Sequence, residues 1–113
     1  AAFRWVSVIR LPDFVTEEEL CWAKQAACEK KKLDCGAVEF LTVEEGLCVQ
    51  CMHLGPFDTE AETVARMDSF LAEKGYVNDL SETRMHHEIY LSDARRVIPE
   101  KWKTVIRHPI RRG

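Results

Sequence analysis

The sequence has no long apolar run, no excess of positive charge and no regular cysteine spacing, and each absence excludes a class of protein. No stretch approaches the roughly 20 apolar residues that cross a bilayer. The formal net charge is −3, whereas nucleic-acid-binding proteins usually present a basic face to the phosphates. We therefore expect no association with a membrane and no direct contact with nucleic acid.

The five cysteines are an odd number without the spacing of a disulfide framework. This pattern favours free thiols in a reducing compartment, so we expect a cytoplasmic protein. Cys48 and Cys51 match C-x-x-C, but residues three apart on a strand point to opposite faces, so the two sulfurs cannot chelate one metal ion. His86 and His87 fail as a ligand pair because adjacent strand residues also point to opposite faces. We expect no metal and no cofactor.

What the sequence does contain is typical of one globular domain. Its 113 residues are 46% hydrophobic and 31% charged, which is enough for a single core. Capping-box patterns at Thr16–Glu19 and Thr59–Glu62 predict the starts of helices over 17–32 and up to Gly75. The strands are predicted, from β-branched and aromatic content and from alternation, at 3–11, 37–44, 46–54, 85–91 and 102–108.

The predicted order is therefore β-α-β-β-α-β-β. This order indicates an α+β fold: an antiparallel sheet with both helices on one face and the other face open as a ligand cleft. Gly46 supplies the positive φ of a tight hairpin between 37–44 and 46–54. Residues 76–84 are predicted to be irregular.

Alternation assigns the side chains of the segment 85–91 to two faces. Ile89 and Leu91 are predicted to face the core, which leaves His86, Glu88 and Tyr90 on the open face. A carboxylate beside aromatic rings attracts an organic cation through its charge and through the ring quadrupoles. Glu88 is therefore the main candidate for ligand contact.

Other interpretations of these residues stay open at this point. Glu88 could instead form a cross-strand salt bridge with Arg107 or Arg10. Trp5 is predicted on the same open face as Tyr90, and the two aromatic side chains could equally belong to a dimer interface or a small second core.

Four stretches in order along the chain resemble one known family. They are WVSVIRLPDFVTEE at 5–18, EGLCVQCMHLGPFD at 45–58, HEIYLSDARR at 87–96 and WKTVIRHPI at 102–110. Together they resemble the GyrI-like small-molecule-binding family, whose fold also serves as the effector-binding domain of multidrug-sensing transcription activators. The resemblance covers nearly the whole chain.

The resemblance implies a fold and a site. In this family, paired strand-helix-strand-strand repeats bind lipophilic, often cationic, molecules at a concave junction. Its cleft glutamate corresponds to Glu88, and the aromatic residue of its Gly-Pro-aromatic turn corresponds to Phe57, where the family commonly has tyrosine. Residues 1–113 are expected to form a single GyrI-like domain that lacks the N-terminal strand-helix-strand of longer relatives.

Three functions are compatible with the resemblance. We expect first a binding module for a lipophilic, in some cases cationic, small molecule, and a homodimer that rebuilds the paired cleft. The first alternative is a hydrolase of strained cyclopropanoid rings, in which Glu88 orients water and His53 is a weaker second candidate. The second is a protein-interaction module such as a topoisomerase modulator. The predicted ligand-binding residues are Glu88, Tyr90, Trp5, Phe57, His53 and His86.

Overall fold

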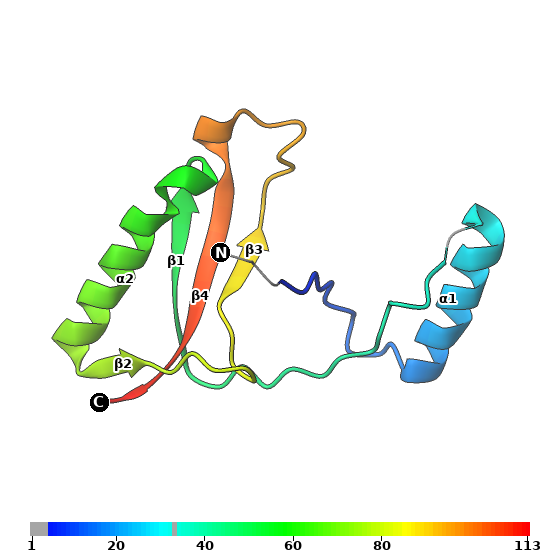
Figure 1. The fold of residues 1–113 in the computed structure, drawn as a ribbon, viewed down its shortest axis with the longest axis horizontal. Helices are drawn as coiled ribbons and strands as arrows, with labels where there is room; N and C mark the ends of the chain where they lie inside the picture. Colours follow the sequence, from blue (N-terminus) through cyan, green and yellow to red (C-terminus); the bar gives the residue numbers. More distant parts are fainter. Residues whose placement is uncertain (1–4, 33) are drawn as a thin grey trace. The chain divides into compact units, whose positions relative to one another are not determined.

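The computed structural model describes residues 5–32 and 34–113 (Figure 1). The chain divides into two units, Ala1–Thr42 and Val43–Gly113, and each is described by itself. Within the described ranges, no helix is long and apolar enough to cross a membrane.

The described residues of the first unit contain one helix, α1 (Glu17–Lys31). The predicted capping box is confirmed, because the Thr16 hydroxyl accepts from the Glu19 backbone N–H and the Glu19 carboxylate accepts from the Thr16 backbone N–H, each at 3.3 Å. The helix ends at Lys32, whose φ of 54° is left-handed. None of the described residues of this unit is buried.

The predicted strands at 3–11 and 37–44 are wrong where the structure describes them. Residues 3 and 4 lie outside the described residues, and residues 5–11 and 37–44 belong to no strand. The hairpin predicted around Gly46 is therefore also not formed. The reason is that a strand requires a hydrogen-bonded neighbour, and β propensity alone cannot supply one.

The second unit is a four-stranded antiparallel sheet with one helix. The long strand β4 (Lys103–Arg112) is central: it pairs with β1 (Cys48–Leu54), with β3 (His87–Tyr90) and with β2 (Tyr76–Asn78), all antiparallel. The short strand β2 lies where the sequence predicted irregular structure. Together with α1, this arrangement confirms the predicted α+β class with an antiparallel open sheet.

Strand β4 continues past the residue at which the sequence predicted its end. Pro109 lacks a backbone N–H and normally interrupts a central strand. Here β3 pairs only as far as Arg107 and β2 begins its pairing at Ile110, so Pro109 lies between the two ladders. Its carbonyl still accepts from the Asp79 N–H at 2.9 Å. The strand therefore tolerates this proline.

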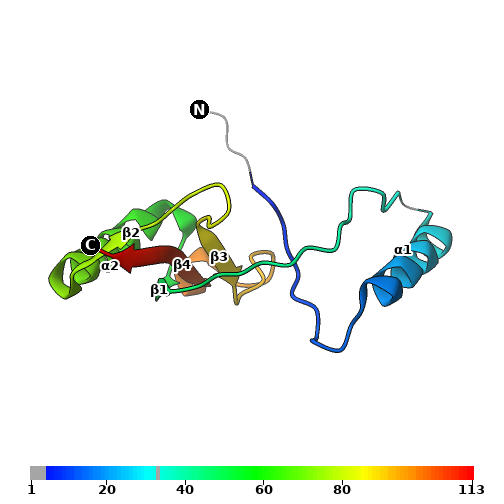
Figure 2. The same ribbon diagram turned by 90° about the horizontal axis from the view of Figure 1, so that it is seen from below.

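Helix α2 (Glu60–Lys74) packs on one face of this sheet, as Figures 1 and 2 show. It ends at Gly75, whose φ of 79° is the left-handed conformation that glycine adopts without strain. The apolar core between helix and sheet is formed by Val49, Met67, Leu71, Ile106 and Ile110. Four polar residues are buried as well: His53, Thr63, Thr104 and His108.

The predicted assignment of faces on β3 is reversed. Glu88 pairs directly with Ile106, and Tyr90 with Thr104, so their side chains lie on the α2 face of the sheet. Ile89 pairs with Val105 on the far face. The prediction assumed that the apolar members of the strand face the helix. That assumption fails because the helix face of this sheet buries several histidines and threonines.

Candidate functional site

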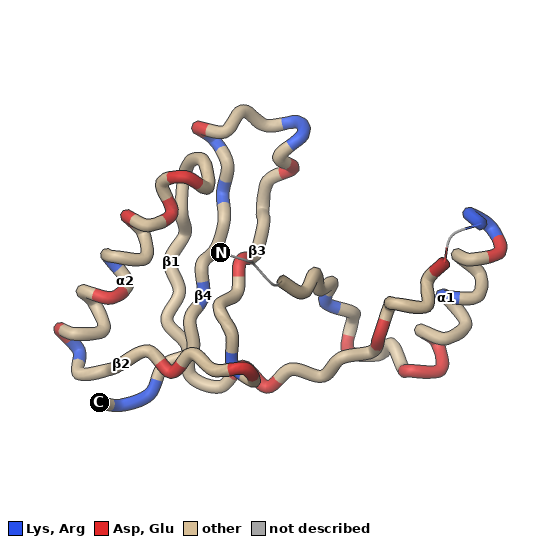
Figure 3. The backbone as a smooth tube through the Cα atoms, in the orientation of Figure 1, with Lys and Arg blue, Asp and Glu red and all other residues tan. Residues whose placement is uncertain are grey.

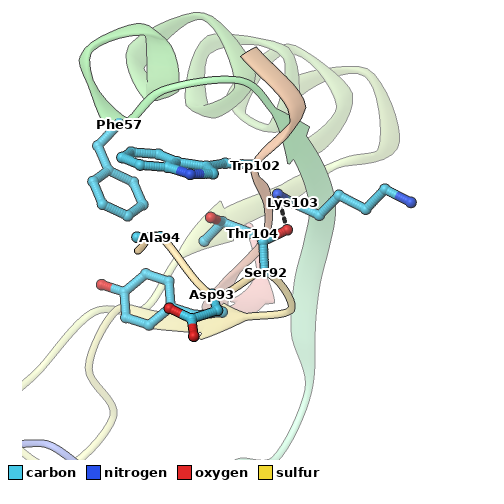
Figure 4. A pocket seen from close by; sticks show the side chains of 8 residues that line it. Phe57, Ser92, Asp93, Ala94, Trp102, Lys103 and Thr104 are labelled. Atoms are coloured by element: carbon cyan, nitrogen blue, oxygen red, sulfur yellow. Dashed lines mark hydrogen bonds between the residues drawn. The ribbon is translucent and has the colours of Figure 1, made fainter. Parts of the chain in front are cut away.

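A cavity of about 340 Å³ opens at the end of the sheet in the second unit (Figure 4). Its wall combines three aromatic rings with a few polar groups, and the lining residues are Phe57, Tyr90, Ser92, Asp93, Ala94, Trp102, Lys103 and Thr104. The Lys103 side chain extends away from the rings, while its backbone N–H donates to the Ser92 hydroxyl at 3.0 Å. The volume is within the range of small-molecule pockets.

The three aromatic rings form a contiguous cluster. The Phe57 ring lies 4.8 Å from that of Trp102 and 5.5 Å from that of Tyr90, both in tilted geometry. The turn before Phe57 is fixed by Gly55, whose φ of 120° favours glycine and whose N–H donates to the Trp102 carbonyl at 2.9 Å. The Trp102 indole donates to the Val97 carbonyl at 2.7 Å. These hydrogen bonds fix the orientation of the rings.

Glu88 lies beside this cluster rather than in the cavity wall itself. Its Oε2 accepts from the Tyr90 hydroxyl at 3.0 Å, and its Oε1 lies 3.7 Å from His86 Nε2. The alternative salt bridge with Arg107 is not formed. Arg107 pairs with Glu45 at 2.8 Å, and Arg10 pairs with Asp13 at 3.0 Å.

A second carboxyl group, Glu60 at the start of α2, lies within hydrogen-bond reach of Glu88. Figure 3 shows acidic residues, in red, at the start of α2 and within β3. Burial, together with the hydrogen bond and charge of Glu88, raises the pKa of Glu60 to about 8. Burial alone would raise the pKa of Glu88, but hydrogen bonds from Glu60 and Tyr90 and the charge of His86 outweigh it and lower this pKa. Glu88 is therefore ionised at neutral pH.

Two histidines extend this polar group toward the core. His86 Nδ1 lies 2.6 Å from His108 Nε2, so the N–H of one ring donates a hydrogen bond to the ring nitrogen of the other. His108 is buried, and burial followed by the charge of His86 lowers its pKa below the usual value. The pair thus holds His86 in place next to Glu88.

His53 lies in the core, with both ring nitrogens occupied. Its Nε2 lies 2.9 Å from the Pro56 carbonyl and its Nδ1 lies 2.6 Å from the Thr63 hydroxyl, a pattern that fits a neutral ring. Thr59 also donates to the Pro56 carbonyl, at 3.0 Å, and makes no side-chain cap on α2. The second predicted capping box is therefore absent, because this hydroxyl closes the turn before the helix.

The structure does not join all six predicted residues into one site. Phe57 and Tyr90 line the cavity, and Glu88 with His86 lies behind Tyr90. Trp5 is in the first unit, where 80% of its surface is exposed. Its role as a ligand contact stays a prediction.

Sequence reasoning missed three residues of this region. Trp102 is predicted only as the first residue of a strand and as part of the stretch at 102–110, whereas it lines the cavity. Asp93 lines the cavity and pairs with Arg95 at 3.2 Å. Glu60 carries no local signal, because its contact with Glu88 joins residues far apart in the chain.

Comparison with known proteins identifies the family. The sequence model described as "GyrI-like small molecule binding domain" matches residues 12–111. The chain belongs to the GyrI-like small-molecule-binding family. No curated protein matches the chain.

Solved structures agree with membership of the GyrI-like family. The chain is 50% identical to a protein described as a hydrolase from Listeria innocua, with a TM-score of 0.85 over 90% of this chain and 52% of that one. It is 52% identical to an uncharacterized conserved protein from Listeria innocua, with a TM-score of 0.86 over 90% of this chain and 50% of that one. The chain thus spans about half the length of the solved proteins that it matches.

Proposed function

We propose that this GyrI-like binding module takes a lipophilic organic cation at the aromatic cavity. The observation that supports this most directly is the position of Tyr90, whose ring lines the cavity while its hydroxyl donates to the Glu88 carboxylate. Aromatic faces attract a cation, and a nearby carboxylate adds Coulomb attraction that increases as water is excluded. The lowered pKa of Glu88 keeps that charge present at neutral pH.

The test uses Glu88→Gln, which keeps the shape of the side chain and removes its charge. Affinity for tetraphenylphosphonium should fall by about 1–3 kcal/mol, the range for losing a desolvated charge partner. Calorimetry measures this affinity, and thermal denaturation should show a stability change of roughly 1 kcal/mol or less. Triphenylphosphine oxide, a neutral ligand with the same phenyl groups, should bind both proteins alike.

Asp93→Asn is the matched control, since Asp93 is a second carboxylate of the same cavity but already pairs with Arg95 and Arg96. Its removal should change the affinity much less than Glu88→Gln. If Glu88→Gln melts much earlier than the parent and binds the cation equally well, Glu88 has a structural role and the proposal fails.

A hydrolase of strained cyclopropanoid rings is the second candidate. Two of the similar Listeria innocua structures are described as hydrolases. The observation in its favour is the contact of the two carboxyl groups, Glu60 and Glu88, one of which can hold a proton while the other accepts one. Mass spectrometry of a cyclopropanoid electrophile should then show addition of one water molecule by the parent protein and none by Glu88→Gln.

We also propose that the protein is a cytoplasmic homodimer. All five cysteines are free, which suits a reducing compartment. The far face of the sheet has an apolar row across three strands, formed by Met52, Val105 and Ile89, with Met52 41% exposed. Burying such a row between two copies stabilises association by about 25 cal/mol per Å² of apolar area.

A further inference from the structure

Glu60 and Glu88 lie in a contact that is unfavourable between two ionised carboxylates. The Glu60 side chain lies within hydrogen-bond reach of Glu88, and its Oε2 is buried and accepts no hydrogen bond. Two carboxyl groups attract one another only when one of them holds a proton and donates it. One proton held between the two groups therefore stabilises this contact.

The surroundings decide which carboxyl group holds that proton. Glu88 accepts from the Tyr90 hydroxyl and lies near His86 Nε2, so its negative charge is stabilised. The Oε2 atom of Glu60 is buried and has no hydrogen-bond donor, so a negative charge on Glu60 is not stabilised in the same way. The proton therefore stays on Glu60, in agreement with the raised pKa of Glu60 and the lowered pKa of Glu88.

The charged and titratable groups facing this pair come from two neighbouring strands. Tyr90 on β3 and His86, the residue immediately before β3, lie next to Glu88, and His108 on β4 contacts His86. In the part of the chain that the structure describes, neither carboxyl group forms an ion pair with lysine or arginine. A bound cation would therefore bring to the pair a positive charge that no lysine or arginine supplies there.

We propose that this domain exchanges a proton for its cationic ligand, with the proton leaving the Glu60–Glu88 pair for the solvent as the cation binds. The proposal rests on the proposed function. Phe57 lies three residues before Glu60, and Tyr90 contacts both the cavity and Glu88, so a cation among the rings lies close to the pair. Its positive charge favours the doubly ionised pair and removes the need for the shared proton.

Linkage fixes the direction of the effect. If cation binding expels a proton, lowering the proton concentration must strengthen cation binding by the same coupling. Affinity should rise with pH until Glu60 is ionised without ligand, near its pKa of about 8, and then level off. A coupling of one pKa unit corresponds to about a tenfold rise in affinity. A neutral ligand has no charge to replace the proton and should show no rise.

The experiment is calorimetric titration of the full chain with tetraphenylphosphonium at about pH 7.5, in phosphate and in Tris, whose ionisation enthalpies differ. The difference in apparent enthalpy gives the protons released, and we expect roughly half a proton per ligand. Glu60→Gln keeps a hydrogen-bond donor toward Glu88 but has no proton to lose, so it should bind with no release. Glu62→Gln, an exposed acid of the same helix, should behave as the parent.

Each outcome has one meaning. Absence of tetraphenylphosphonium binding to the parent protein overturns the proposed function itself. Binding without proton release, or release that persists in Glu60→Gln, overturns the exchange and leaves the binding function in place. Should Glu60→Gln not fold, the parent alone decides: an affinity that is constant between about pH 6.5 and 9 contradicts the exchange.

Discussion

At the scale of the single residue, Glu60 links the stability of the second unit to pH. Its folded pKa of about 8 lies above the ordinary value of 4.5, so the native protein holds a proton that the unfolded chain releases. The free energy of unfolding then falls as pH rises from about 4.5 to about 8, because Glu60 ionises at a lower pH in the unfolded chain than in the native protein. His108 acts in the opposite direction: its pKa is lowered, so stability is lost as pH falls below its ordinary value of 6.5.

The first prediction separates these two effects with Glu60→Gln. The variant has no group to titrate at this position, so its loss of stability between about pH 5 and 8 should be smaller than that of the parent. Below about pH 6.5 the variant should keep the loss of stability that His108 causes as pH falls, whereas in the parent the gain from Glu60 opposes that loss down to about pH 4.5. Urea denaturation at a series of pH values measures the free energy of unfolding. Identical pH profiles for the two proteins would contradict the raised pKa of Glu60.

The second prediction concerns His53, whose ring joins the end of β1 to α2. In His53→Ala the Thr63 hydroxyl and the Pro56 carbonyl each lose one of their hydrogen-bond partners, and a small cavity remains. We expect the free energy of unfolding to fall by about 2–4 kcal/mol. Thr63→Val removes one of these hydrogen bonds and should cost about 1–2 kcal/mol. A catalytic His53 would behave differently: the alanine variant would keep its stability and lose only turnover.

At the scale of the element, helices and central strands were predictable because their signals are local. The cap at Thr16, the stop at Gly75 and the β-branched run of β4 each act within a few residues of the chain. The predictions of strands at 3–11 and 37–44 are wrong for the described residues, because a strand also needs a second strand to pair with, and β propensity does not provide one.

The site was predictable only in part, for a different physical reason. Alternation correctly grouped Glu88 with Tyr90 and His86, since residues two apart share a face. It could not say which face, because polar residues such as Thr104 are buried beneath the helix. The contact of Glu60 with Glu88 depends on how α2 is docked on the sheet. No pattern within one element contains that information.

The third prediction tests the register of β1. Cys51 pairs with Ile106 on the helix face, and Cys48 pairs with Pro109, three residues along, on the other face. The predicted opposite orientation of the two sulfurs is thus confirmed. Elemental analysis of the purified protein should find no stoichiometric zinc, and Cys48→Ser with Cys51→Ser should leave tetraphenylphosphonium affinity nearly unchanged. One zinc per chain, lost in the double variant, would show that the strand register is wrong.

At the scale of the whole molecule, much apolar surface is exposed. In the first unit Trp5, Ile9 and Phe14 are each at least 79% exposed, and in the second unit Leu54 is 65% exposed beside the row at Met52. Exposed contiguous apolar surface usually marks an interaction site. Leu54 follows Met52 by two residues on the same strand, so both lie on the far face.

The fourth prediction is that the protein sediments as a homodimer at high micromolar concentration. Met52→Glu together with Leu54→Glu should shift it toward monomer, because a carboxylate in a buried apolar contact is costly. Sedimentation velocity measures both. Glu62→Gln, on the exposed side of α2, should leave the distribution unchanged. A parent protein that is monomeric at that concentration would remove the dimer and leave the far face available to another partner.

The mixed core beneath α2 has a calorimetric consequence. Unfolding usually increases heat capacity by about 12–15 cal/mol/K per residue, since apolar exposure raises this quantity and polar exposure lowers it. The buried side chains of the second unit include four polar residues beside five apolar ones, and many large apolar side chains are already exposed in the native state. The heat-capacity increment of this protein should therefore be small. Its stability curve is then flat, so that the free energy of unfolding bends only weakly with temperature.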